Sequence, residues 1–184
     1  MNQKIAQKIS RVLSRYSPQN KEESIVIEYG IEIILEFIIK IFIVISLGIV
    51  CNKLIETIFF LLTLSVLRSQ AGGIHAKTGW GCLISMIVVW SIGIYVNEFV
   101  WLSKIQVLGL SVGYVFIFFY IAPQFTDKGI QLDRKRMLEK KFYSVLLVIC
   151  FMTIAYFNCR LRGVLIVVVS AETITITLER RKRT

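Results

Sequence analysis

Two side chains that could do nucleophilic chemistry together, His75 and Cys82, lie seven residues apart in the stretch RSQAGGIHAKTGWGC, residues 68–82. A cysteine attacks a carbonyl group as its thiolate, and a histidine within hydrogen-bond reach is the usual base that forms the thiolate. His75 is the only histidine of the chain. These residue types therefore predict a thiolate–imidazole pair.

The spacing allows this pair only if the backbone leaves helical geometry between the two residues. On an unbroken helix they would be separated by about 10.5 Å along the axis, which is too far for direct proton transfer. The stretch holds four glycines that permit such a departure: Gly72, Gly73, Gly79 and Gly81. A helix that begins at Cys82, with Arg68 and Lys77 nearby, would also stabilise the thiolate. The plain alternative, a loop histidine and a packed cysteine, stays open.

Composition places these residues in a membrane protein. Apolar residues make up 55% of the 184, and the charged residues are clustered between apolar runs. The net charge of +10 could suggest nucleic acid, but no recognition fold is present, so no nucleic-acid partner is expected. The four cysteines form no C-x-x-C pair, and one histidine beside one cysteine leaves metal coordination unfilled. We therefore expect no metal and no cofactor.

The elements that must position the pair are apolar helices. Six apolar segments are expected, over residues 30–50, 54–67, 83–102, 105–122, 142–158 and 164–178. They predict an all-α integral membrane protein that forms a single membrane domain over residues 1–184 and begins with an amphipathic interfacial helix over residues 1–17. The second and sixth segments are shorter than the roughly 20 residues that cross a bilayer. Each is therefore either a tilted span or a re-entrant segment.

Basic residues set the expected orientation. The N-terminal helix, the loop 123–141 and the tail ERRKRT should all be cytoplasmic, and six crossings satisfy all three. The same topology places residues 68–82 at the cytoplasmic face, where thiols stay reduced. Arg160 and Arg162 would then lie outside, and they count against this topology.

Charged residues also occur within the apolar segments. The first segment carries four of them at four-residue spacing: Glu28, Glu32, Glu36 and Lys40. Glu36 and Lys40 form a ready i,i+4 pair. Glu32 has either a structural ion pair or a role at the site, such as orienting the histidine or lining a peptide path. Glu172, in the sixth segment, has the same two interpretations.

The pattern Arg68-x-x-x-Gly72-Gly73-x-His75-Ala76, followed by Cys82, resembles the signature of the AgrB (accessory gene regulator B) family. Members of that family are membrane cysteine endopeptidases of Gram-positive quorum sensing. The resemblance covers the whole chain, with YG before the first apolar segment, AP after the fourth, and Lys128 in the basic loop that follows. Gly129 stands where family members usually carry proline, which affects the expected turn of that loop.

The resemblance implies a mechanism. His75 would draw the proton from Cys82, which would attack a backbone carbonyl of an AgrD-like precursor peptide and form an acyl-enzyme thioester. A cysteine or serine of the peptide would then displace Cys82 and close a thiolactone or lactone ring. Arg68 would hold the loop or precursor carboxylates. Backbone N–H groups near Cys82, with Gln70, Gly72 and Gly73 as supporting residues, would stabilise the oxyanion or position the segment.

The family's precursors resemble amphipathic helices with an acidic tail. Such a tail would be attracted to a cluster of basic residues at the inner surface: Lys128, Arg134, Lys135, Arg136, Lys140 and Lys141. The same charges could serve only to set topology. The resemblance further implies a multi-pass protein of the bacterial cell membrane, in contact with lipid, and a homodimer.

Two competing functions stay open. A small membrane transporter or exporter could use Glu32, Glu172 and His75 as polar groups along a path, although no inverted repeat or pair of broken spans is evident. A scaffold without chemistry would not need the glycine-rich interruption. Dependence on the Cys82 thiol distinguishes the enzyme from the transporter.

Overall fold

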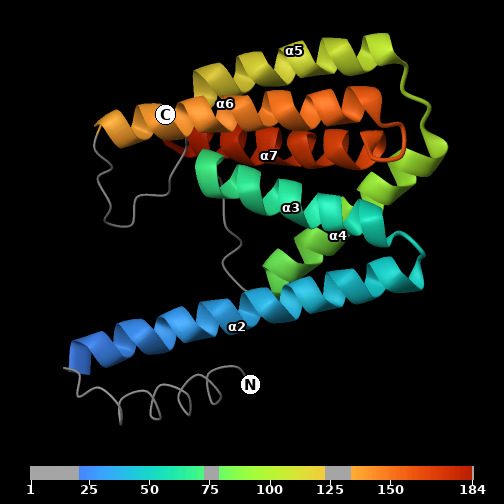
Figure 1. Cartoon of the computed structure of the whole chain (residues 1–184). Helices are drawn as coiled ribbons and strands as arrows, with labels where there is room; N and C mark the ends of the chain where they lie inside the picture. Colours follow the sequence, from blue (N-terminus) through green and yellow to red (C-terminus); the bar gives the residue numbers. More distant parts are fainter. Residues whose placement is uncertain (1–20, 73–78, 123–133, 184) are drawn as a thin grey trace. The chain divides into compact units, whose positions relative to one another are not determined.

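The computed structural model describes residues 21–72, 79–122 and 134–183, and over these residues it is all-helical (Figure 1). The helices are α2 (Lys21–Val50), α3 (Leu54–Ala71), α4 (Gly79–Phe99), α5 (Lys104–Ile121), α6 (Arg134–Phe157) and α7 (Arg162–Arg183). The predicted all-α class is confirmed. The amphipathic helix predicted over residues 1–17 lies outside the described residues.

Four of these helices are long and apolar enough to cross a membrane. The spans are Leu54–Ala71, Gly79–Phe99, Lys104–Ile121 and Lys135–Phe157. Large apolar side chains on them face outward, for example Ile84 at 60% exposure and Phe116 at 62%. Such broad apolar exposure is typical of a lipid-facing surface and not of a soluble domain. The chain is therefore a multi-pass membrane protein.

The chain divides into two compact units, residues 1–47 and 48–184. The first unit contains most of α2. There the Lys40 ammonium donates to the Glu36 carboxylate at 3.0 Å, which confirms the expected i,i+4 pair. The side chain of Glu32 lies outside the described residues, so its role stays a prediction.

In the second unit α7 is the central helix and packs against α3, α4, α5 and α6. Its aliphatic side chains fill the core, with Val164, Leu165 and Val168 fully buried. A β-carbon at Gly93 of α4 would come within 3.5 Å of the Val164 Cα atom, which shows how closely α4 approaches α7. Since protein surrounds α7, it has less need of the long apolar surface that a lipid-exposed span requires. This explains why its apolar segment is short.

One end of this second unit is held together by Arg160 and Arg162, and we call it the arginine end. The Arg160 side chain donates to the buried Glu56 carboxylate of α3 at 2.8 Å, and this hydrogen bond raises the pKa of the Arg160 guanidinium. Lys53 and Glu98 form a second ion pair at this end. The Asn97 side chain of α4 bonds to the Arg160 carbonyl at 2.7 Å and to the Gly163 N–H at 2.9 Å.

The Arg162 side chain satisfies backbone carbonyls that have no intrahelical partner. It donates to the carbonyls of Ala155 and Tyr156, in the last turn of α6, at 3.1 Å each, and to that of Leu102 at 2.8 Å. Both arginines that counted against the six-crossing topology are thus engaged in structural contacts.

Replacing Arg162 with alanine is expected to lower the free energy of unfolding by about 2–4 kcal/mol, because three backbone carbonyls lose a charged donor. Replacing the exposed Arg181 of α7 is the matched control and should change it by less than about 0.5 kcal/mol. Thermal unfolding of the purified variants in detergent measures both. Equal stability of the two variants would contradict the structural role given to Arg162.

The opposite end of the unit contains the C-terminal end of α3 and the N-terminal end of α4, and we call it the cysteine end. Successive helices run in opposite directions, so the ends of α5 and α7 and the start of α6 lie there too (Figure 1). The Arg180 side chain of α7 donates to the Tyr120 carbonyl of α5 at 3.4 Å, which ties two of these helix ends together. The connection that carries Arg160 and Arg162 and the candidate catalytic Cys82 therefore lie at opposite ends of the unit.

Candidate functional site at the cysteine end

The stretch that holds the candidate site begins where α3 stops at Gly72. The N–H of Gly72 donates to the Arg68 carbonyl at 3.1 Å, which closes the last turn of α3. Gly72 has φ 74° and ψ −147°, a conformation that L-residues with side chains rarely adopt. The predicted need for a glycine in this interruption is therefore met at a defined position, where the chain turns away from α3.

Cys82 is the fourth residue of α4, in the first turn of that helix, and its thiol is free. Its side chain is half-buried, so it is screened from bulk water and still accessible to a reactant. The first four N–H groups of a helix have no intrahelical acceptor, and together with the helix dipole they favour an anion. These groups are the donors nearest in sequence to Cys82 that could stabilise a thiolate or an oxyanion.

The hydroxyl group closest in sequence to Cys82 is already bonded elsewhere. The Ser85 side chain donates to the Gly81 carbonyl at 2.6 Å and approaches the Cys82 carbonyl at 3.1 Å. It therefore serves the backbone of α4 and not the thiol. Trp80, in the same turn, is 76% exposed, as expected of an aromatic side chain at a membrane–water interface.

Arg68 lies in the last turn of α3 and interacts electrostatically with Glu172 of α7. The Glu172 side chain is 1% exposed, and one of its carboxylate oxygens accepts a hydrogen bond from the Thr175 hydroxyl at 3.1 Å. The sequence left two interpretations of Glu172 open, a structural ion pair or a role at the site. The packing of α3 against α7 brings Glu172 within electrostatic reach of Arg68.

The described members of the basic cluster lie on the first two turns of α6. Lys135 and Arg136 are exposed, and Lys140 and Lys141 are half-buried. The Lys141 ammonium lies 4.6 Å from the centre of the Phe119 ring of α5, a cation–π contact. The first turn of α6 has no acidic residue, so its positive charges oppose the helix dipole. Helix stability therefore does not explain why they are there.

Several predicted site residues lie outside what the structure describes. These are Gly73, His75 and Lys128, together with the side chains of Glu32 and Arg134. Gln70 is described, on α3, with a half-buried side chain. The pairing of His75 with Cys82 stays a prediction. In the described part of the chain, no three metal-binding side chains cluster together.

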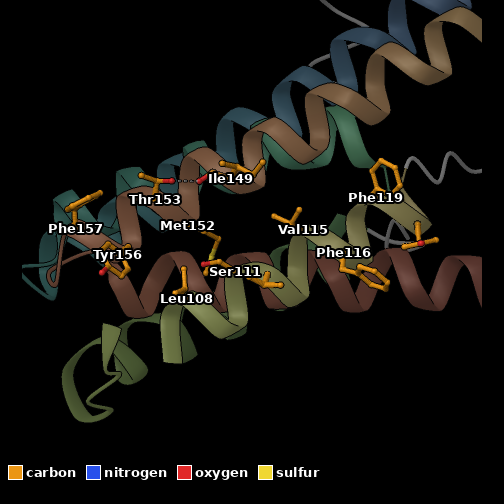
Figure 2. A pocket seen from close by; sticks show the side chains of 12 residues that line it. Leu108, Ser111, Val115, Phe116, Phe119, Ile149, Met152, Thr153, Tyr156 and Phe157 are labelled. Carbon is orange, nitrogen blue, oxygen red and sulfur yellow. Dashed lines mark hydrogen bonds between the residues drawn. The ribbon is translucent and has the colours of Figure 1, made fainter. Parts of the chain in front are cut away.

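A groove of about 710 Å³ lies between α5 and α6 (Figure 2). Its walls are apolar and aromatic, and its two alcohol side chains, Ser111 and Thr153, donate to carbonyls of their own helices. Among the described residues that line it there is no cysteine, histidine or acid. The groove thus offers apolar binding surface, while the groups able to do chemistry lie elsewhere.

These observations define a class: a multi-pass helical membrane protein with a free, half-buried cysteine in the first turn of one span. Comparison with known proteins then gives the family. The family profile described as Accessory gene regulator B, AgrB, matches residues 3–178. The chain belongs to the AgrB family.

Relatives agree with this assignment. The AgrB-like protein 2 of Clostridium perfringens strain 13 is 32% identical over 145 residues, which cover 74% of this chain and 66% of the relative. An AgrB-like protein of Clostridium perfringens strain SM101 is 28% identical over the same shares of both chains. One of Clostridium acetobutylicum is 26% identical over 83% of this chain and 73% of its own. The chain thus spans just under two thirds of the length of the first two relatives. No solved structure matches it.

Proposed function

We propose that this protein is a membrane cysteine endopeptidase that processes an AgrD-like precursor peptide for quorum sensing and promotes its cyclisation. Membership of the AgrB family and the full R-x-x-x-G-G-x-H-A-x(5)-C pattern support the proposal. The observation that carries it is the position of Cys82, free and half-buried in the first turn of α4, at the same end of the unit as Arg68 and the basic turns of α6.

In the proposed reaction His75 takes the proton from the Cys82 thiol, and the thiolate attacks a carbonyl carbon near the C-terminal part of the precursor. Backbone N–H groups of the first turn of α4 stabilise the oxyanion. The C–N bond breaks, the leaving amine takes the proton from the His75 imidazolium, and a thioester to Cys82 remains. A thiol or hydroxyl of the peptide then attacks the thioester, a ring closes, and Cys82 leaves as thiolate and regains its proton.

The charges at the cysteine end suit such a substrate. Lys135, Arg136, Lys140 and Lys141 could attract an acidic peptide tail, with Lys128 and Arg134 extending the cluster. Their unfavourable placement at a helix N-terminus indicates that they serve either a partner or the orientation in the membrane. Both roles agree with a cytoplasmic cysteine end, cytoplasmic chain termini and a multi-pass position in the bacterial cell membrane. A homodimer is part of the same proposal.

Intact-mass analysis tests the proposal. Purified protein in lipid nanodiscs, mixed with a candidate precursor that carries an acidic C-terminal tail, is expected to gain the mass of the truncated peptide. The Cys82→Ala variant should gain none, and Cys159→Ala, which removes an exposed cysteine at the arginine end, should behave like wild type. An unchanged adduct in Cys82→Ala would overturn the assignment of the nucleophile.

The alternative function is a small transporter or exporter of a peptide or other solute that does not use Cys82 chemistry. A transporter should tolerate Cys82→Ser, which keeps size and polarity, whereas the peptidase should lose its activity. If neither precursor cleavage nor an adduct occurs in folded, precursor-bound wild type, the transport function gains support.

A further inference from the structure

Helices α3 and α7 run side by side in the same direction (Figure 1). At the arginine end, Arg160 just before α7 pairs with Glu56 in the first turn of α3, 104 positions earlier in the chain. Arg68 and Glu172 have the same separation, each twelve residues further along. Because every helical residue advances by 1.5 Å, Arg68 lies about 18 Å beyond Glu56 along α3, and Glu172 lies further along α7 in the same direction. An acid of α3 thus pairs with an arginine just before α7 at one end, and α3 and α7 carry an arginine and an acid towards the other.

Water has less access to Glu172 than to the Glu56–Arg160 pair. Arg160 is 55% exposed, so water solvates part of the Glu56–Arg160 pair. The Glu172 side chain is 1% exposed on the central helix of the unit. The Thr175 hydroxyl satisfies one of its oxygens but brings no charge. Ionising a buried carboxyl group is costly without a positive partner, and the charge of Arg68 acts favourably on the Glu172 carboxylate.

Arg68 connects this buried charge to the candidate site. Its carbonyl accepts the N–H of Gly72, the residue at which the chain turns away from α3 towards Cys82. Fixing the Arg68 side chain fixes the last turn of α3, and with it the point from which that segment departs. Catalysis is sensitive to small displacements of the elements that position reacting groups.

We propose that Glu172 is a positioning residue that holds Arg68 and thereby sets the end of α3 from which the Gly72–Cys82 segment departs. This inference rests on the proposed function for its catalytic consequence, but not for the pairing itself. Glu172 touches neither the thiol nor the peptide in this scheme. Its effect passes through Arg68 and the backbone of Gly72.

The pairing is tested without any activity. Unfolding equilibria in detergent are measured for Glu172→Gln, Arg68→Gln and the double variant, in a double-mutant cycle. If the two residues stabilise each other, each single substitution already removes their interaction. The unfolding equilibrium constant of the double variant should then be at least tenfold smaller than the product of the two single effects predicts. Additive effects of the two substitutions would overturn the pairing.

The catalytic consequence is tested by the single-turnover rate of thioester formation at saturating precursor. Glu172→Gln should lower this rate by about 10- to 100-fold with little change in precursor affinity, and Glu172→Asp should recover part of it. Glu56→Gln is the matched control, because it removes the carboxylate of the equivalent pair at the arginine end. It should reduce stability without slowing the reaction of the folded fraction.

Equal rates for folded Glu172→Gln and Glu56→Gln would overturn the positioning role. If wild type itself forms no thioester, the proposed function fails, and the double-mutant cycle still decides whether Glu172 and Arg68 are paired.

Discussion

Replacing His75 with alanine is expected to slow the acylation of Cys82 by about 10²- to 10⁴-fold, the usual contribution of a general base. The loss should fall on the rate at saturating precursor and not on precursor affinity, since the imidazole acts on the reacting thiol. Raising the pH should restore part of the rate, because solvent base can then remove the thiol proton. Single-turnover measurements of the adduct mass would detect both effects. They should cover about pH 6 to pH 9, the range in which imidazole and thiol groups ordinarily titrate.

Ser85→Ala is the matched control for this prediction. Ser85 lies within one turn of Cys82, but its hydroxyl bonds only to backbone carbonyls of its own helix. Its replacement should leave the acylation rate near that of wild type. If His75→Ala acylates as fast as Ser85→Ala at every pH, the histidine is not the base, and the thiol must be activated by the helix N-terminus alone.

Replacing Gly163 with alanine is expected to lower the free energy of unfolding by about 3 kcal/mol or more. A β-carbon at this position would lie 2.4 Å from the Asn97 Cα atom and 2.5 Å from its backbone nitrogen. Backbone cannot rotate away as the end of a side chain can, so α4 and α7 would have to separate. That shift would also break the two bonds of the Asn97 side chain to Arg160 and Gly163.

Gly113→Ala in α5 provides the comparison, because nothing lies within 4 Å of the β-carbon it would gain. Since glycine inside a helix costs about 0.5–1 kcal/mol relative to alanine, this variant should be as stable as wild type or more stable. Chemical unfolding in mixed micelles, followed by helical circular dichroism, measures both variants. Equal stability of Gly163→Ala and Gly113→Ala would contradict the close packing of α4 against α7.

Much of the fold could be predicted from periodicity and charge alone. A helix in lipid must satisfy its own backbone, so long apolar runs could only become helices, and the predicted all-α class is confirmed. The pair Glu36–Lys40 is also confirmed, because residues four apart on a helix are neighbours wherever the helix lies. The family could be recognised from residues 68–82, since the glycines, the histidine and the cysteine keep a fixed local spacing there.

The features that could be predicted are therefore local: which segments are helical, where α3 ends, and which residues could do chemistry. The tertiary structure decided which distant residues meet. It made α7 the central helix, gave Arg160 and Arg162 structural partners, and brought Glu172 within electrostatic reach of Arg68. The physical reason is that charge pairing and close packing between helices depend on their relative register and rotation. These are set by contacts spread over the whole helix bundle, which no short stretch of sequence contains.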